Sequence, residues 1–373
     1  MKIADVHVTI EYMEATYWLG FSVFPGVGPK KFRLLLDRFG TAESAWKADG
    51  EELQAVLGNA LAPKLVEFRG KFSLEEYEEG LKKSGVGFLT LQNEGYPELL
   101  KEIADAPFVL YIKGDKDVLS RQGIAIVGTR KITEYGREVT RQITEQLVGA
   151  GYAIVSGLAL GVDAVAHRTC VENGGRTIAV LGCGVDCCYP GANQKLYDDI
   201  VGSGGAIVSE FPLGMQPSLG SFPSRNRIIA GLSQAVIVTE GASDSGALYT
   251  ADDAFSVGRK VFAVPGPITS SLSQGPHGLV AKGAQLVTSV EDILVSLGNG
   301  KDVTRFRSSK MISSEVKEEQ EILDLLQNES LHIDEIVKKT GSDVVSIGTL
   351  LSMMEIKGMV KTLEAGTFGL ADH

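Results

Sequence analysis

Short apolar runs rich in β-branched residues alternate with helical patterns from about residue 106 to residue 298. The runs predict strands at 108–112, 124–128, 152–156, 177–182, 206–210, 235–240 and 261–266. Helical patterns fill the gaps, at 134–149, 161–173, 192–202, 224–232, 246–257 and 275–283. This alternation predicts an α/β domain with a parallel sheet, right-handed crossovers and helices on both faces. Because the strands are apolar throughout, we expect the sheet to be buried on both sides.

Residues 1–105 form a first block whose apolar spacing is helical. From Pro25 to Trp46 it reads PGVGPKKFRLLLDRFGTAESAW, a Gly-apolar-Gly turn followed by an amphipathic helix. The pattern resembles a helix-hairpin-helix or SAM-like element, whose turn can offer backbone N–H groups to a DNA phosphate. A small helical packing domain without DNA contact explains it equally well, and both interpretations stay open.

A polar, basic stretch at 299–315 predicts a linker, and residues 316–373 follow as a third block. This block has the pattern of two helices, a longer helix and a glycine-centred hairpin, which is the outline of a winged helix. Winged helices usually place the third helix in a DNA major groove. Here that helix has Asp343 and Glu355 at its ends and little basic charge before Lys357. We therefore expect the block to contact protein rather than DNA.

The net charge of −11 argues at first sight against nucleic acid, but the negative charge is confined to the flanks. Residues 43–105 hold 13 acidic and 7 basic residues, and residues 311–373 hold 12 and 5. The middle of the chain is therefore not acidic, and bulk charge does not exclude a local phosphate site. No apolar run reaches about 18 residues, and the N-terminus lacks a signal-peptide core. We expect a cytoplasmic protein without membrane contact.

The chain has four cysteines, at 170, 183, 187 and 188, three of them in the segment GCGVDCCYP. Their spacing, with His167 three residues before Cys170, matches no standard zinc signature. We expect reduced cysteines packed in the core and no metal.

Residues suited to anion binding follow the predicted strands. In an open parallel sheet, ligands bind beyond the carboxyl ends of the strands, where helix N-termini converge. Glycines, hydroxyl-bearing residues and an arginine stand at these positions, namely Gly128, Thr129, Arg130, Ser156, Gly157, Ser245 and Gly246. Neither G-x-G-x-x-G after the first strand nor a P-loop occurs, so we expect no dinucleotide and no cofactor. Several small anion sites suit a polyanion such as a nucleic-acid backbone.

The segment FPSRNRIIAG, from Phe222 to Gly231, adds two arginines to this edge. Pro223 can open a helix, which would put Arg225, Asn226 and Arg227 near its first turn, where the helix dipole disfavours cations. Two arginines there suggest an anion between them, and Phe222 could stack on a base. The alternative is that an arginine pairs with Glu210 or Glu240. We expect one arginine to be structural and one to face the ligand.

Several segments in this order resemble the DprA/Smf family. They are GTR (128–130), SGLALGVDAVAH (156–167), TIAVLGCGVDCCYP (177–190), SEFPLG (209–214), FPSRNRIIAGLS (222–233), SGALYTADDA (245–254), GRKVFAVPG (258–266) and GLVAKGA (278–284). Each is weak alone, but together they are specific.

The resemblance implies an extended Rossmann-like domain that binds single-stranded DNA, forms a homodimer and loads the RecA recombinase during natural transformation. By motif, the DNA-facing residues would be Arg130, Ser156, Gly157, Phe222, Arg225, Asn226, Arg227, Ser245 and Gly246. One departure is Leu160, because the family usually has arginine in S-G-L-A-R-G. The change would lower affinity unless Arg168 substitutes.

Two enzymatic readings and one structural reading compete with this one. Rossmann-like phosphoribohydrolases place a glycine-rich loop near a glutamate, and Glu240 before GASDSGAL has a similar position. The P-G-G-x-G-T run of those enzymes is absent. A hydrolase triad of Ser156, Asp163 and His167 can also be drawn, although Asp163 and His167 lie four apart on one helix and more simply pair with each other. A structural adaptor is the third reading. We expect a binding protein rather than an enzyme.

Overall fold

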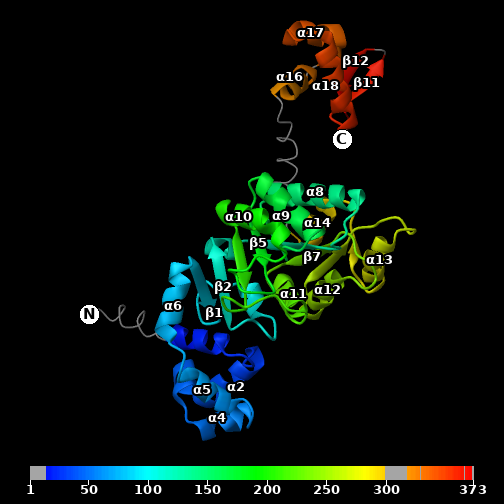
Figure 1. Cartoon of the computed structure of the whole chain (residues 1–373). Helices are drawn as coiled ribbons and strands as arrows, with labels where there is room; N and C mark the ends of the chain where they lie inside the picture. Colours follow the sequence, from blue (N-terminus) through cyan, green and yellow to red (C-terminus); the bar gives the residue numbers. More distant parts are fainter. Residues whose placement is uncertain (1–13, 299–316, 328, 365, 372–373) are drawn as a thin grey trace. The chain divides into compact units, whose positions relative to one another are not determined.

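The computed structural model describes residues 14–298, 317–327, 329–364 and 366–371. The chain divides into two compact units, Met1–Gly300 and Lys301–His373 (Figure 1). The predicted linker at 299–315 lies outside the described residues.

The larger unit begins with a set of short helices. Residues 14–23 are helical, and α2 (Pro29–Phe39), α3 (Ala42–Lys47), α4 (Gly50–Leu57), α5 (Ala62–Arg69) and α6 (Leu74–Lys83) follow. Aromatic side chains join them to the sheet, because the ring of Phe32 on α2 stacks on that of Phe108 with centroids 4.1 Å apart. The ring of Trp18 packs edge-on against Phe32 at 4.7 Å. The turn between the first two helices is therefore part of one continuous core.

A nine-stranded sheet forms the centre of this unit, in the order β1-β2-β6-β5-β4-β3-β7-β8-β9. The strands are β1 (Val86–Thr90), β2 (Val109–Gly114), β3 (Gly123–Val127), β4 (Ala153–Ser156), β5 (Thr177–Val180), β6 (Ala206–Ser209), β7 (Ala235–Val238), β8 (Lys260–Ala263) and β9 (Gln285–Leu286). The seven predicted strands are confirmed as β2 to β8, and β3 to β7 are buried at every position. Across the sheet from β6 through β5, β4, β3, β7 and β8 to β9, every neighbouring pair of strands is parallel.

Two predictions are wrong at one edge of the sheet. Residues 86–90, expected to be helical, form β1, and β2 runs antiparallel to both β1 and β6. These two strands precede the first β-α-β crossover, so no helix imposes a parallel direction on them.

Helices cover both faces of the sheet, as predicted. The helices α8 (Glu134–Gly149), α9 (Val162–Glu172) and α10 (Gln194–Gly202) lie together on one face (Figure 1). The helices α11 (Ser221–Gly231), α12 (Gly246–Ser256) and α13 (Gln274–Ala281) cover the other. The shorter elements are α7 (Glu98–Lys101), η1 (Lys116–Ser120), η2 (Gly191–Asn193), η3 (Ser271–Ser273) and α14 (Val290–Ser296).

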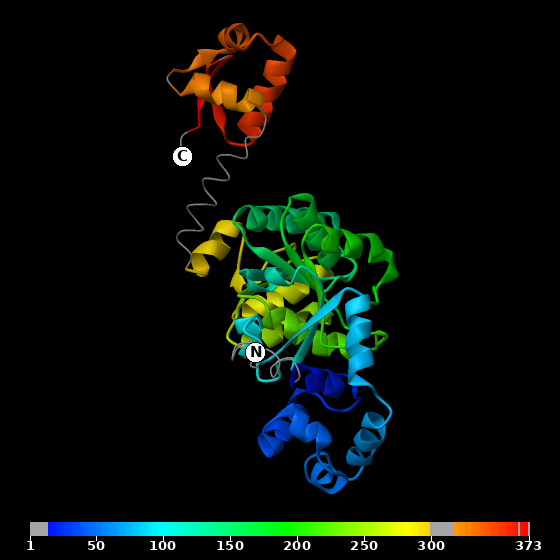
Figure 2. The ribbon, with the colours of Figure 1, turned by 90° about the vertical axis from the view of Figure 1, so that its left-hand side faces the viewer.

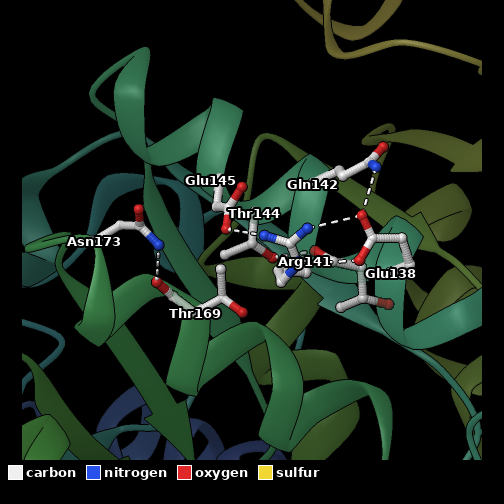
Figure 3. Close-up of polar contacts among 8 residues, drawn as sticks. Glu138, Arg141, Gln142, Thr144, Glu145, Thr169 and Asn173 are labelled. Carbon is white, nitrogen blue, oxygen red and sulfur yellow. Dashed lines mark hydrogen bonds and ion pairs between the residues drawn. The ribbon is translucent and has the colours of Figure 1, made fainter. Parts of the chain in front are cut away.

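The surface of α8 has a polar network (Figure 3). Arg141 donates hydrogen bonds to Glu138 one turn before it and to Glu145 one turn after it. On neighbouring α9, the Asn173 amide donates to the Thr169 carbonyl and closes the end of that helix. These bonds are local to each helix, so they stabilise α8 and α9 individually.

The smaller unit has the predicted winged-helix elements (Figure 2). They are α16 (Lys317–Leu326), β10 (Leu331–His332), α17 (Ile333–Thr340), α18 (Val344–Ile356), β11 (Val360–Glu364) and β12 (Thr367–Leu370), with the strand order β10-β12-β11. Ile322, Ile336, Ile347, Leu351 and Met354 form its buried core.

Candidate nucleic-acid interface

The strand order creates a switch point between β3 and β7. Successive strands from β3 to β6 extend the sheet in one direction, whereas β7 to β9 lie on the other side of β3. Loops that leave the carboxyl ends of such a strand pair diverge and open a crevice for ligands. The loop after β3 begins with Gly128-Thr129-Arg130, and the loop after β7 begins with Thr239-Glu240.

Hydrogen bonds fix the loop after β3 in place. The Thr129 N–H donates to the Glu240 carbonyl oxygen at 2.7 Å, and the Thr129 carbonyl oxygen accepts from the Val162 N–H at 3.1 Å. The buried Glu240 carboxylate accepts from the Thr133 N–H at 2.9 Å and from its hydroxyl at 2.6 Å. Thr129 is buried and Arg130 is exposed. The arginine thus projects from a rigid loop.

Arg130 belongs to a cluster with two aromatic rings, here called the aromatic–arginine cluster and made up of Arg130, Tyr189 and Phe222. The Arg130 guanidinium carbon lies 5.6 Å from the centroid of the Phe222 ring, within cation–π range. The rings of Phe222 and Tyr189 are 5.5 Å apart and tilted by 36°. Tyr189 is 43% exposed and Phe222 is half-buried.

Arg225 does not face solvent, although the family resemblance places it among the DNA-facing residues. It is 6% exposed, and its guanidinium donates to the carbonyl oxygens of Gly157 (2.6 Å) and Val180. A Cβ at position 157 would overlap this guanidinium, so the approach requires glycine. Arg225 therefore holds the loop after β4 against the end of β5 from beneath.

Asp163 and His167 bind elsewhere rather than to each other. The buried Asp163 carboxylate accepts from the N–H groups of Gly157 (3.1 Å) and Ala159 (3.4 Å). Burial raises the pKa of Asp163, against the opposing effect of Arg225. The His167 Nδ1 pairs with the Thr177 hydroxyl at 2.7 Å. This hydroxyl donates to the Ile154 carbonyl, so the imidazole carries the proton on Nδ1.

The hydrolase triad is not assembled. The buried Ser156 hydroxyl donates to the Ile126 carbonyl oxygen on β3 at 2.7 Å rather than to the imidazole of His167. Burial also lowers the pKa of His167 to about 3, so the ring is neutral and a weak base.

Arg227 is structural. It forms ion pairs with Glu210 at 2.5 Å and with Asp105 at 3.3 Å, and its side chain is largely buried. Burial raises the pKa of Glu210 despite this arginine. Arg225 and Arg227 therefore both have partners within the protein. The expectation that one of them faces the ligand is not supported by their positions.

The last predicted residues lie where α11 meets α12. The buried Asn226 amide donates to the Gly246 carbonyl oxygen at 3.3 Å. The Ser245 hydroxyl caps α12 by accepting from the Ala247 N–H at 3.4 Å. Gly246 is exposed, and Gly128 and Ser245 are half-buried. These positions offer backbone and hydroxyl groups rather than charge.

All four cysteines are free thiols, and Cys170 and Cys183 are buried. Burial raises the pKa of both thiols to about 12. Within the described ranges, no group of three or more histidine, cysteine, aspartate or glutamate side chains could hold a metal ion. No helix in the same part of the chain is long and apolar enough to cross a membrane.

Residues 87–298, which include all of these loops, match the DNA recombination-mediator protein A family, and residues 312–366 match the DprA winged helix domain. The chain belongs to the DNA recombination-mediator protein A family. It is 37% identical to protein Smf of Synechocystis sp. across 93% of this chain and 96% of that protein.

Two solved structures of the family resemble this chain. DNA processing protein A of Streptococcus pneumoniae is 35% identical, with a TM-score of 0.65, over 75% of this chain and 95% of that one. The Helicobacter pylori protein, described for its single-stranded DNA binding mode, is 32% identical with a TM-score of 0.51. That match covers 56% of this chain and 95% of the other.

The sequence did not predict Tyr189 as part of the candidate site. The signal available for it is an aromatic residue in the loop after β5, directly behind the cysteines of GCGVDCCYP. Leu160, where the resemblance leads us to expect arginine, is 44% exposed beside the loop after β4. Arg168 lies two turns along α9 from that position and is exposed.

Proposed function

We propose that this protein binds single-stranded DNA along the carboxyl edge of its sheet and catalyses no reaction on it. The observation that carries the proposal is the aromatic–arginine cluster, whose residues follow the carboxyl ends of β3, β5 and β6. An arginine and two aromatic rings there offer a cation for a phosphate and ring faces for bases. Only unpaired bases can stack in this way, which favours single-stranded over duplex DNA.

The predicted DNA-binding residues fall into three groups in this proposal. Arg130 and Phe222 contact the strand with their side chains, joined by Tyr189. The backbone N–H groups of Gly128 and Gly246 and the side-chain hydroxyls of Thr129 and Ser245 supply hydrogen bonds to phosphates. The remaining residues support the surface from beneath, namely Ser156, Gly157, Arg225, Asn226 and Arg227.

The geometry gives less support to the phosphoribohydrolase alternative. Such an enzyme would use Glu240 as an acid, but both carboxylate oxygens of Glu240 accept hydrogen bonds from Thr133. A group occupied in holding the loop after β3 is poorly placed to act on a substrate.

We further propose that the DNA-bound protein acts in recombination by loading the RecA recombinase onto the strand, in the cytoplasm and as a homodimer through the sheet domain. Membership of a family of recombination mediators supports the first part. Exposed apolar side chains on the sheet domain, Tyr249 and Ile268, support an interface with a second copy.

The test is fluorescence anisotropy with a labelled 20-nucleotide single strand and the matching duplex, measured across a salt series. Arg130→Gln should weaken single-strand binding and reduce the slope of log K against log salt by about one phosphate contact, or roughly 0.7. Arg121→Gln is the matched control, because Arg121 is exposed and lies just before the amino-terminal end of β3, away from the carboxyl ends where the proposed site lies. Equal losses in the two variants, or binding of duplex as tight as that of single strand, would overturn the proposal.

A further inference from the structure

The outward face of α18 has exposed apolar side chains at both ends and two hydroxyl-bearing residues between them. Ile347, Leu351 and Met354 point into the core of the smaller unit. The opposite side presents Val345, Thr349, Ser352, Met353 and Ile356, at the spacing of a single helix face. We call these five residues the α18 face. Val345 is 78% exposed and Ile356 is 87% exposed, so no described residue of the smaller unit covers them.

The two hydroxyl groups of the α18 face are already used. Thr349 donates to the Val345 carbonyl oxygen and Ser352 to the Gly348 carbonyl oxygen, both at 2.9 Å within the helix. Their methyl and methylene groups therefore face solvent, while the donors needed to contact bases or phosphates are turned away. The distance from Val345 to Ile356 along the helix axis is about 16 Å, enough for three turns of a partner helix.

The charges around α18 disfavour DNA. No lysine or arginine occurs among its 13 residues, and Lys357 just beyond it pairs with the buried Glu319 at 2.8 Å. Exposed carboxylates stand at the two ends, Asp343 and Glu355. A helix that enters a major groove needs cations to reach the phosphates, and this one would bring anions instead.

The net negative charge of the smaller unit disfavours a second copy of this chain as the partner of the α18 face. Residues 311–373 hold 12 acidic and 5 basic residues, so two such units would repel each other. A cationic partner is attracted by the same field. We propose that the α18 face binds an amphipathic helix of another protein, whose apolar side chains pack on Val345 and Ile356 and whose flanking lysines or arginines meet Asp343 and Glu355. This inference does not depend on the proposed binding of single-stranded DNA.

The experiment uses the full chain and a fluorescein-labelled 18-residue peptide with leucine on one helical face and lysine elsewhere. A peptide with glutamate in place of lysine is the charge control. The wild-type chain should bind the lysine peptide and not the glutamate peptide. The double variant Val345→Gln, Ile356→Gln should bind the lysine peptide at least ten-fold more weakly. Both side chains are exposed, so the fold should persist, and circular dichroism checks this.

A matched double variant, Leu34→Gln, Val295→Gln, makes the same chemical change at two exposed positions of the larger unit and should bind like wild type. The proposal is overturned if wild type does not bind the lysine peptide, or if both double variants lose binding equally. It is also overturned if the α18 variant loses affinity for duplex DNA, or if it abolishes a self-association seen for wild type in sedimentation.

Discussion

Replacement of Arg225 by methionine should destabilise the larger unit without directly removing a DNA contact. The guanidinium is almost fully buried, donates to the carbonyl oxygens of Gly157 and Val180, and lies near the buried carboxylate of Asp163. Methionine fills similar volume but leaves two buried acceptors unpaired and the Asp163 charge without its cation. Breaking a buried pair of this kind costs about 3–5 kcal/mol.

The assay is differential scanning calorimetry of the full chain, with the transition of the larger unit followed separately. At about 2–4 °C per kcal/mol for a unit of this size, its Tm should fall by at least about 6 °C. Arg130→Met is the matched control, because the same substitution at an exposed arginine should leave Tm within about 1 °C. The reasoning is refuted if Arg225→Met melts like wild type, or if the two variants lose equal stability.

Three other changes have defined outcomes. Phe222→Ala should weaken single-strand binding by about 1–3 kcal/mol with little change in the salt slope, because a stacked base is lost but no phosphate contact is; a change in slope at unchanged affinity would instead mean that the ring only positions Arg130. Burial lowers the pKa of His167 from 6.5 in the unfolded chain to about 3 in the folded protein. Between these pH values the unfolded chain binds more protons than the folded protein does. The free energy of unfolding should therefore fall as pH drops below about 6.5, by up to roughly 1.4 kcal/mol per pH unit. In chemical denaturation between pH 7 and 4, the free energy of unfolding should depend less on pH for His167→Gln than for wild type. An equal pH dependence in the two proteins would contradict the lowered pKa of His167. Deletion of residues 311–373 should leave single-strand binding unchanged or slightly tighter in anisotropy titrations, because the deleted block is acidic; a ten-fold loss would make it a DNA-binding module.

The parallel sheet could be predicted because its evidence is local. Strands β3 to β7 are buried on both faces, so each appears in the sequence as an uninterrupted apolar run between glycine-rich turns. β1, with the sequence VGFLT, is partly exposed and follows a helix, and its pairing with β2 depends on residues 19 to 27 positions away. Local pattern carries no information about such a partner.

The candidate site was predictable in its location but not in the roles of its side chains. The order of the glycine-rich turns placed the site at the carboxyl edge, where the aromatic–arginine cluster lies. The burial of Arg225 depends on the missing side chain of Gly157 and on Asp163, which come from a different loop. The same holds for Tyr189, which meets Phe222 only because the loops after β5 and β6 converge.

The central claim is that an unpaired base stacks at Phe222, and a Phe222→Trp variant tests it most directly. The two native tryptophans, Trp18 and Trp46, are buried among the N-terminal helices and give a constant background. Addition of an unlabelled single strand should quench the new tryptophan in a saturable manner, with the affinity found by anisotropy, whereas the duplex of the same sequence should not. Single-strand binding in anisotropy without any change in the fluorescence of Trp at this position would contradict the account.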